Sequence, residues 1–180
     1  MNRNSLFFRL AFAACLVTFF FAPVRETAAQ QEYRSRKTAG RAATGARSLA
    51  TEESSIFALV NRERARSNLS GLVWDAELAA LARSYSQKMA DESFFGHIDG
   101  DNRSVVERAE NFGLRYWRKI GENLFFSQGY DRFDAVAVRG WMNSPSHREN
   151  ILDRRFNASG IGVARAPGGK IYVTQIFMQK

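Results

Sequence analysis

The sequence predicts an α+β domain in which helices cover an antiparallel sheet. Apolar residues recur at helical spacing between residues 54 and 143, whereas residues 160–178 contain two β-prone runs joined by a glycine-containing bend. Because the helical segments come first and most strands last, the two kinds of element are expected to pack as separate layers. A length of 180 residues leaves room for one such domain with extensions.

Residues 1–29 have the composition of a signal peptide. Arg3 and Arg9 form a basic start, residues 10–21 an apolar stretch, and residues 27–29 a small-residue cleavage site. A retained membrane helix is the alternative, but it needs about 20 apolar residues, and charged residues follow the apolar stretch too soon. We therefore expect an exported protein, periplasmic or extracellular, with no transmembrane anchor after the signal is cleaved.

Residues 30–52 are rich in Arg, Ala, Gly, Ser and Thr and have almost no large apolar side chains. Such a segment buries too little surface to offset its ordering entropy, so we predict a disordered basic linker. The folded domain is expected over residues 53–180. The net charge of +8 is not gathered into a basic stripe with interleaved aromatic residues, so no nucleic-acid partner is expected.

The single cysteine, Cys15, lies within the predicted signal peptide. The mature chain then has no thiol, which excludes thiol catalysis, zinc–cysteine sites and disulfides.

Two helices are expected at the start of the domain. The first begins at Ser54 or Ser55, whose hydroxyls suit an N-cap, and the second follows the N-cap residue Asp75. The second helix has an apolar face that we expect to be buried, formed by Leu78, Leu81, Ala82, Tyr85 and Met89.

Two more helices are expected before the strands. A short helix follows Ser104, with Val105, Val106, Ala109 and Phe112 facing inward. Another covers residues 131–143 and ends near Ser144, because Pro145 disfavours helical backbone in the residue before it. Residues 150–156 are expected to form one apolar turn. The chain then closes as a hairpin of residues 160–164 and 170–178.

Three polar residues are candidates for a site, provided that the fold brings them together. His97 lies in a polar loop, His147 follows a helix-ending Ser-Pro, and Glu122 lies in an apolar run. A single histidine of this kind is more often a surface or turn-bracing residue than a ligand. A carboxylate in an apolar run must be paired or hydrogen-bonded, in either a structural or a functional role.

Known catalytic motifs are absent from the sequence. No His-x-x-x-His or His-Glu-x-x-His is present, which excludes a zincin. The chain also has no Gly-x-Ser-x-Gly elbow and no glycine-rich phosphate loop, so a serine hydrolase reading of Ser144, Ser146 and His147 has little support.

An ordered set of short motifs nevertheless resembles the CAP superfamily, which comprises cysteine-rich secretory proteins, antigen 5 and pathogenesis-related protein 1. Its domains are also called SCP domains, and the bacterial branch is the most similar. The matching segments are residues 60–64, 72–78, 96–97, 121–124, 141–152, 160–163 and 174–177. None of them is diagnostic alone, but their order over nearly the whole domain is highly specific.

The resemblance implies a three-layer α-β-α sandwich with a central antiparallel sheet and a cleft lined by two histidines and two acids. His97 and Glu122 match the first histidine and the glutamate of the Gly-Glu-Asn motif, whose last residue is Asn123. Ser144 and Tyr172 stand where eukaryotic relatives have the second glutamate and the second histidine. His147 belongs to a bacterial Ser-Pro-x-His-Arg pattern and reaches the cleft from another wall.

Some relatives hold a divalent metal in this cleft, zinc among them. The resemblance therefore implies a zinc site with His97, Glu122 and His147 as ligands, which would suit an open site completed by water. With Ser144 in place of the second acid, a metal-free site is the alternative.

Three functions follow as hypotheses. The first is a non-enzymatic binding module for a small apolar or lipid ligand or an envelope protein, with aromatic residues such as Phe95 and Phe126 lining a groove. The second is a metal-dependent, protease-like hydrolase in which Glu122 acts as base or ligand. The third is a structural role, in which His97, Glu122 and His147 brace loops. We favour the binding module because no nucleophile is evident.

Overall fold

The computed structural model describes residues 49–129 and 132–180, which lie in one compact unit, Gly40–Lys180. The predicted signal peptide, residues 30–48 of the predicted linker and Cys15 lie outside the described residues. A helix over residues 49–66 opens the described chain. The elements that follow are β1 (Val73–Trp74), α2 (Ala76–Asp91), α3 (Val105–Asn111), β2 (Lys119–Gln128), α4 (Asp134–Asn143), α5 (Pro145–Leu152), β3 (Ala158–Ala166) and β4 (Lys170–Gln179).

The four strands form one sheet in the order β1-β3-β4-β2. The predicted hairpin is confirmed as the antiparallel pair β3–β4, and β2 pairs antiparallel with the other side of β4. The two-residue strand β1 pairs parallel with β3 and makes the sheet mixed. As a result β2 is an edge strand over its whole length, which leaves one of its sides open to loops and helix ends.

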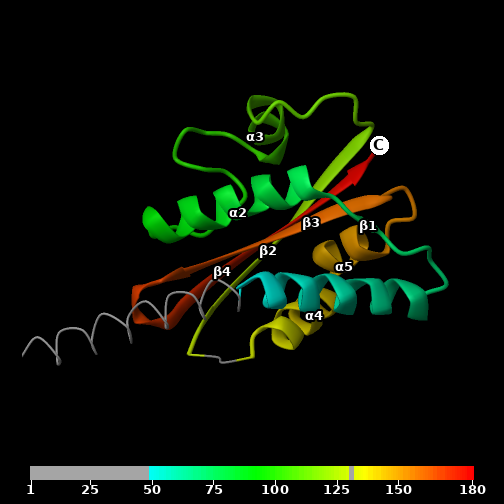
Figure 1. The fold of residues 1–180 in the computed structure, drawn as a ribbon, viewed down its shortest axis with the longest axis horizontal. Coiled ribbons are helices and arrows are strands. Elements are labelled where there is room, and N and C mark those ends of the chain that lie inside the picture. The colour runs from blue at the N-terminus through cyan, green and yellow to red at the C-terminus, as the bar shows by residue number, and fades with distance from the viewer. Residues whose placement is uncertain (1–48, 130–131) are drawn as a thin grey trace, which may run out of the picture. The chain divides into compact units, whose positions relative to one another are not determined.

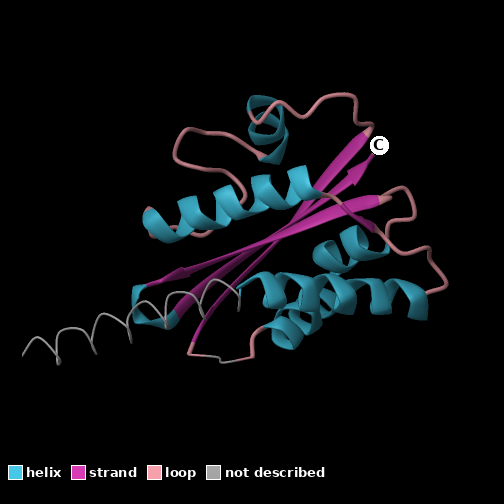
Figure 2. Cartoon of the chain, in the orientation of Figure 1, coloured by secondary structure: helices cyan, strands magenta, loops and turns pink. Residues whose placement is uncertain are grey.

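Helices cover both faces of the sheet, as the predicted sandwich requires. Figure 1 shows α2 and α3 on one face and α4, α5 and the helix over residues 49–66 on the other, and Figure 2 shows the crossed strands between them. The central strand β4 sends Ile171, Val173 and Phe177 into one core and Tyr172 and Ile176 into the cores under α2. Burial on both faces explains why β4 has apolar residues at successive positions on either side of the buried Thr174 and Gln175.

The predicted starts of α2 and α3 are confirmed. Asp75 accepts hydrogen bonds from the backbone N–H groups of Glu77 and Leu78 at 3.0 Å. Ser104 and Glu107 form a reciprocal capping box at the start of α3. These local signals predict helix starts well because the cap satisfies backbone donors within its own first turn.

The predicted cap at Ser54 or Ser55 is wrong, because the first helix already includes residues 49–52, whose composition predicts a linker. Inside the helix, the Ser54 hydroxyl donates to the carbonyl of Ala50, and the Ser55 hydroxyl donates to Asp134 Oδ2 at 2.6 Å. Leu49 packs against the core, which gives these residues a tertiary reason to be helical.

A further helix, α5, covers residues 145–152, whereas the sequence predicts only an apolar turn over residues 150–156. Ser144 has extended backbone between α4 and α5, and Pro145 is the first residue of α5. A proline at this position ends one helix and begins the next, because its fixed φ and missing N–H suit the first helical turn. The prediction used only the first of these two effects.

Close packing of α2 on β3 depends on two glycines, Gly160 and Gly162. A Cβ at Gly162 would lie 2.0 Å from the Arg83 nitrogen, and one at Gly160 would lie 2.1 Å from the Ala79 nitrogen. Both obstacles are α2 backbone, so the helix itself would have to move. The absence of side chains at these two positions of β3 therefore allows the short distance between the strand and α2.

We expect Gly162→Ala to lower the free energy of unfolding by about 3 kcal/mol or more, because an overpacked core must displace a helix. Gly140→Ala is the matched control, since Gly140 is an exposed residue of α4 with open space around it. It should raise stability by roughly 0.5–1 kcal/mol through helix propensity. Urea unfolding measures both changes, and equal midpoints for the two variants would contradict the packing argument.

Candidate functional site

Glu122 is a buried acid on the edge strand β2, with both carboxylate oxygens engaged. Its Oε1 lies 2.9 Å from Nδ1 of His97, and its Oε2 accepts a hydrogen bond of 2.6 Å from Arg108. The expectation that a carboxylate in this apolar run has a partner is therefore confirmed. The partners come from two separate segments, the 92–104 loop and α3.

Arg108 is the cation that compensates Glu122, and the sequence analysis missed it. It is buried, with its guanidinium 3.4 Å from the centre of the Tyr85 ring. Its Nη1 also donates to the carbonyls of His97 and Arg103, at 3.0 and 2.8 Å. One signal could have found it: Arg108 lies at inward helical spacing from Val105, and a buried acid needs a cation.

Tyr85 of α2 also contacts the 92–104 loop. Burial raises the pKa of Tyr85 to about 12, so its hydroxyl stays protonated at physiological pH. That hydroxyl donates to the carbonyl of Gly96 at 2.6 Å. Tyr85 and Arg108 together hold the backbone on either side of the His97 side chain.

His97 presents one ring nitrogen outward. Its side chain is 55% exposed, and Nδ1 faces Glu122, which leaves Nε2 without a hydrogen-bond partner among residues 49–129 and 132–180. A carboxylate at Nδ1 favours the tautomer with the proton on Nδ1 and makes Nε2 the acceptor. Glu122 thus orients an available imidazole nitrogen toward solvent.

His147, on the first turn of α5, completes a histidine pair. The ring centroids of His97 and His147 are 6.4 Å apart, with the planes inclined at 42°. Burial lowers the pKa of His147, and the nearby His97 acts in the same direction. Both effects favour the neutral form of the His147 imidazole, whose ring lies beside that of His97.

Asn123 positions His147 from the opposite face of β2. Alternation along the strand directs it away from Glu122, into the core beneath α5, where it is fully buried. Its amide donates to the His147 carbonyl at 3.0 Å, and its Oδ1 accepts from Asn150 at 2.9 Å. Asn150 also donates to the carbonyl of Glu122 at 3.2 Å. Asn123 thus links α5 to β2 through hydrogen bonds.

Ser144 and Tyr172, the other two predicted cleft residues, lie in different parts of the fold. Ser144 joins α4 to α5 three positions before His147 and makes no side-chain cap hydrogen bond. Tyr172 is buried on β4 in the core beneath α2, and its ring contacts Phe126 at a centroid distance of 5.0 Å. It therefore belongs with an aromatic cluster rather than with the histidines.

An aromatic row of three residues begins in that cluster: the buried Tyr172 contacts Phe126, and Phe126 contacts Phe95. The rings of Phe126 and Phe95 are 5.9 Å apart, and these side chains are 39% and 52% exposed. Phe126 lies four residues beyond Glu122 on the same face of β2, and Phe95 lies two residues before His97. Phe95 is therefore close to His97 along the loop, whereas Phe126 lies about 13 Å along β2 from Glu122.

The geometry alters the expected role of Glu122 at a metal site. Its two oxygens already contact His97 and Arg108, and the described residues contain no group of three or more His, Cys, Asp or Glu side chains placed to hold an ion. A carboxylate that bonds one nitrogen of a histidine is, however, the usual support of a metal-binding imidazole. The residues therefore fit a cation held by two histidines, with Glu122 behind one of them.

A sandwich of this topology with a histidine–glutamate site beside its edge strand defines a class of domain rather than a single protein. Residues 57–177 match the profile of the CAP family, described as the cysteine-rich secretory protein family. This chain therefore belongs to the CAP family.

Two curated proteins of Bacillus subtilis are similar to this chain. The uncharacterized protein YkwD is 34% identical over 133 residues, which are 74% of this chain and 49% of YkwD. The uncharacterized membrane protein YlbC is 32% identical over 131 residues, which are 72% of this chain and 35% of YlbC. This chain spans half or less of the length of these relatives.

Solved structures show the same fold. An extracellular SCP-domain protein of Bacillus anthracis has a TM-score of 0.64 at 31% identity, covering 73% of this chain and 41% of that one. An outer surface protein of Borrelia burgdorferi has a TM-score of 0.65 at 18% identity, covering 72% and 93%. The second likeness concerns the fold alone.

We expect Arg108→Met to lower the free energy of unfolding by about 3–5 kcal/mol, because Glu122 is left buried without its cation. The double variant Arg108→Met/Glu122→Gln should recover part of this loss, since the unpaired charge is removed. Urea unfolding of the two single variants and the double variant gives the coupling energy.

Arg115→Gln serves as the control for this cycle, because Arg115 is exposed and has no ion pair among the described residues. Its stability should stay within about 0.5 kcal/mol of wild type. A double variant no more stable than Arg108→Met would show that the charge of Glu122 is not the cause.

The His147 ring should titrate below the ordinary histidine value of about 6.5, and His97→Ala should raise its pKa without restoring it fully. Removal of His97 abolishes one cause of the shift, and burial remains as the other. Because the unfolded chain binds this proton more readily, His147 makes the fold less stable as pH falls below about 6.5.

Proton NMR of the Cε1 resonances measures both pKa values directly, since the chain has only two histidines. A His147 pKa that does not change in His97→Ala would contradict the proximity of the two rings.

Proposed function

We propose that this protein is an exported, non-enzymatic binding module whose ligand docks on the aromatic row beside the histidine pair. The ligand offers apolar surface, either a lipid or an apolar segment of an envelope protein. The observation that carries the proposal is the adjacent exposure of Phe95 and Phe126, next to the half-exposed His97. Large apolar side chains that are exposed together, rather than singly, are typical of binding surfaces.

Export is supported by two independent observations. Residues 1–29 have the composition of a cleavable signal. The Bacillus anthracis protein that is 31% identical to this chain is described as extracellular. Within residues 49–129 and 132–180, no helix has the length and apolar character needed to cross a bilayer.

The geometry argues against Glu122 as the general base of the hydrolase alternative. A general base must have a lone pair available within reach of its proton donor, whereas both oxygens of Glu122 are already engaged by His97 and Arg108. Glu122 therefore suits the task of orienting His97. The histidine pair suits recognition of a polar head group. The zinc site predicted from His97, Glu122 and His147 is retained here in an altered form, with the two histidines as ligands and Glu122 supporting His97.

The test replaces one ring of the aromatic row at a time. After incubation with a bacterial lipid extract, native mass spectrometry should show bound lipid on the wild-type protein. Phe95→Ser and Phe126→Ser should each weaken retention about tenfold or more, because each removes an apolar contact worth roughly 1.5–3 kcal/mol when buried. Tyr116→Ser is the control, since Tyr116 is an exposed aromatic residue in the loop between α3 and β2 and belongs to no part of the aromatic row.

Zinc titration of the same proteins by calorimetry separates the alternatives. Zinc uptake that is lost in His97→Ala or His147→Ala, with lipid retention unchanged, would assign the histidines to a metal and the row to the lipid. A wild-type protein that retains no lipid, or a Tyr116→Ser variant that loses lipid as strongly as Phe95→Ser does, would overturn the proposed docking surface.

A further inference from the structure

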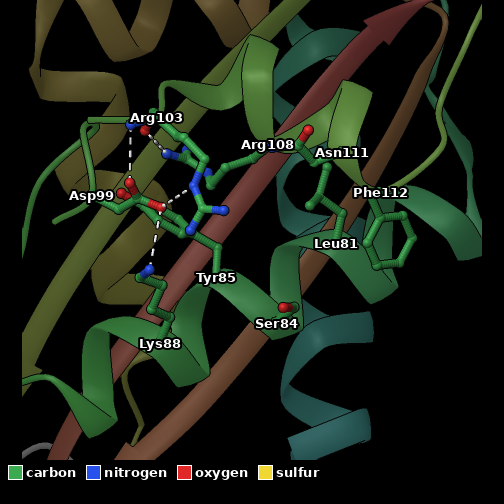
Figure 3. A pocket seen from close by; sticks show the side chains of 9 residues that line it. All are labelled: Leu81, Ser84, Tyr85, Lys88, Asp99, Arg103, Arg108, Asn111 and Phe112. Atoms are coloured by element: carbon green, nitrogen blue, oxygen red, sulfur yellow. Dashed lines mark hydrogen bonds and ion pairs between the residues drawn. The ribbon is translucent and has the colours of Figure 1, made fainter. Parts of the chain in front are cut away.

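Helices α2 and α3 leave a separate pocket between them, on the other side of Arg108 from Glu122. Its volume is ≈ 210 Å³, and its walls are one face of α2, one face of α3 and the loop that contains Asp99 and Arg103. Figure 3 shows these side chains around the opening. No residue of the aromatic row and neither histidine lines it.

The pocket has an apolar end and a cationic end. Leu81 and Phe112 form the apolar end, and Phe112 remains 44% exposed although its helical spacing predicts an inward position. Lys88, Arg103 and Arg108 form the other end, against a single lining carboxylate, Asp99. This lining suits a molecule with a short apolar tail and an anionic head.

Asp99 is engaged in ion pairs and hydrogen bonds that hold this cationic end in place. Its side chain is fully buried, and it accepts hydrogen bonds from the backbone N–H groups of Asp101 and Arg103 at 3.0 and 2.9 Å. It also lies 3.2 Å from Nε of Arg103 and 3.5 Å from Nζ of Lys88, as the dashed lines in Figure 3 indicate. Asp99 thus holds two cations at the mouth of the pocket.

A ligand carboxylate could replace Asp101, the second carboxylate that pairs with these two cations. Asp101 pairs with Lys88 at 2.7 Å and also with Arg103, but it does not line the pocket and is itself exposed. Exposed ion pairs contribute only about 0–1 kcal/mol. A ligand carboxylate can therefore take the place of Asp101 at little cost.

Arg108 adds an independent observation. Its side chain is nine-tenths buried, yet its Nε has no hydrogen-bond partner among residues 49–129 and 132–180. A buried donor without a partner costs about 1–3 kcal/mol, so native structures seldom leave one without a reason. Here the unsatisfied donor belongs to a residue that lines the pocket.

We propose that the α2–α3 pocket is a second binding site, which takes a small amphipathic carboxylate. The carboxylate lies against Lys88 and Arg103, and the tail lies against Leu81 and Phe112. The site is distinct from the proposed docking surface and does not depend on it. Because Arg108 lines this pocket and also holds Glu122, the pocket shares a wall with the histidine site.

Sodium hexanoate is the probe, and hexan-1-ol is its uncharged counterpart. In amide NMR titrations of the purified protein, hexanoate should shift α2 and α3 resonances around Leu81 and Phe112 saturably, and hexan-1-ol should bind at least about tenfold more weakly. Arg103→Gln should weaken hexanoate binding about tenfold through loss of a charge-assisted contact. Phe112→Ser should weaken both probes.

Arg115→Gln and Phe95→Ser are the controls, and both should bind hexanoate as wild type does. Lys88→Gln replaces Arg103→Gln if circular dichroism shows that the latter is unfolded. Equal affinity for hexanoate and hexan-1-ol, the absence of a saturable shift, or loss of binding in Phe95→Ser would overturn the proposal. Loss of lipid retention at the aromatic row leaves these outcomes unchanged, so the two sites are tested separately.

Discussion

The buried ion pair between Glu122 and Arg108 is the interaction on which the site depends. It joins the edge strand β2 to α3, and the same two side chains contact the ring and the carbonyl of His97. A buried charge is tolerated only when an opposite charge and hydrogen bonds compensate its desolvation. The contacts that compensate the buried charge of Glu122 therefore also orient His97. The polar site forms where β2, α3 and the 92–104 loop meet.

Side chains on both faces of the edge strand β2 contribute to the site. Glu122 and Phe126 project toward the α2–α3 side, where they meet the His97 loop and Phe95. Asn123 projects to the other side, where it fastens α5 and so fixes the backbone of His147. One strand thus places both histidines, and no further strand pairs with its open side within the described residues.

Local signals predicted much of the fold correctly. Asp75 and Ser104 begin their helices as expected, and the C-terminal hairpin forms. The resemblance to the family, rather than any local signal, predicts that His97, Glu122 and His147 lie in one place, where the structure has them. The misses have a common origin. The first helix begins ahead of Ser54 because Leu49 packs on the core, and α5 was overlooked because Pro145 was considered only as a helix end. Arg108 was overlooked because its partner is 14 residues away and on another element.

The sequence by itself determined the caps of α2 and α3, the C-terminal β-hairpin, the need of Glu122 for a partner and the membership of the CAP family. These follow from interactions within a few residues or from the order of motifs. Tertiary structure decided which cation meets Glu122, which nitrogen of His97 faces outward, and why Tyr172 joins an aromatic row rather than the histidines. It also created the pocket between α2 and α3. Such choices depend on how closely the layers approach, which Gly160 and Gly162 allow but no local pattern specifies.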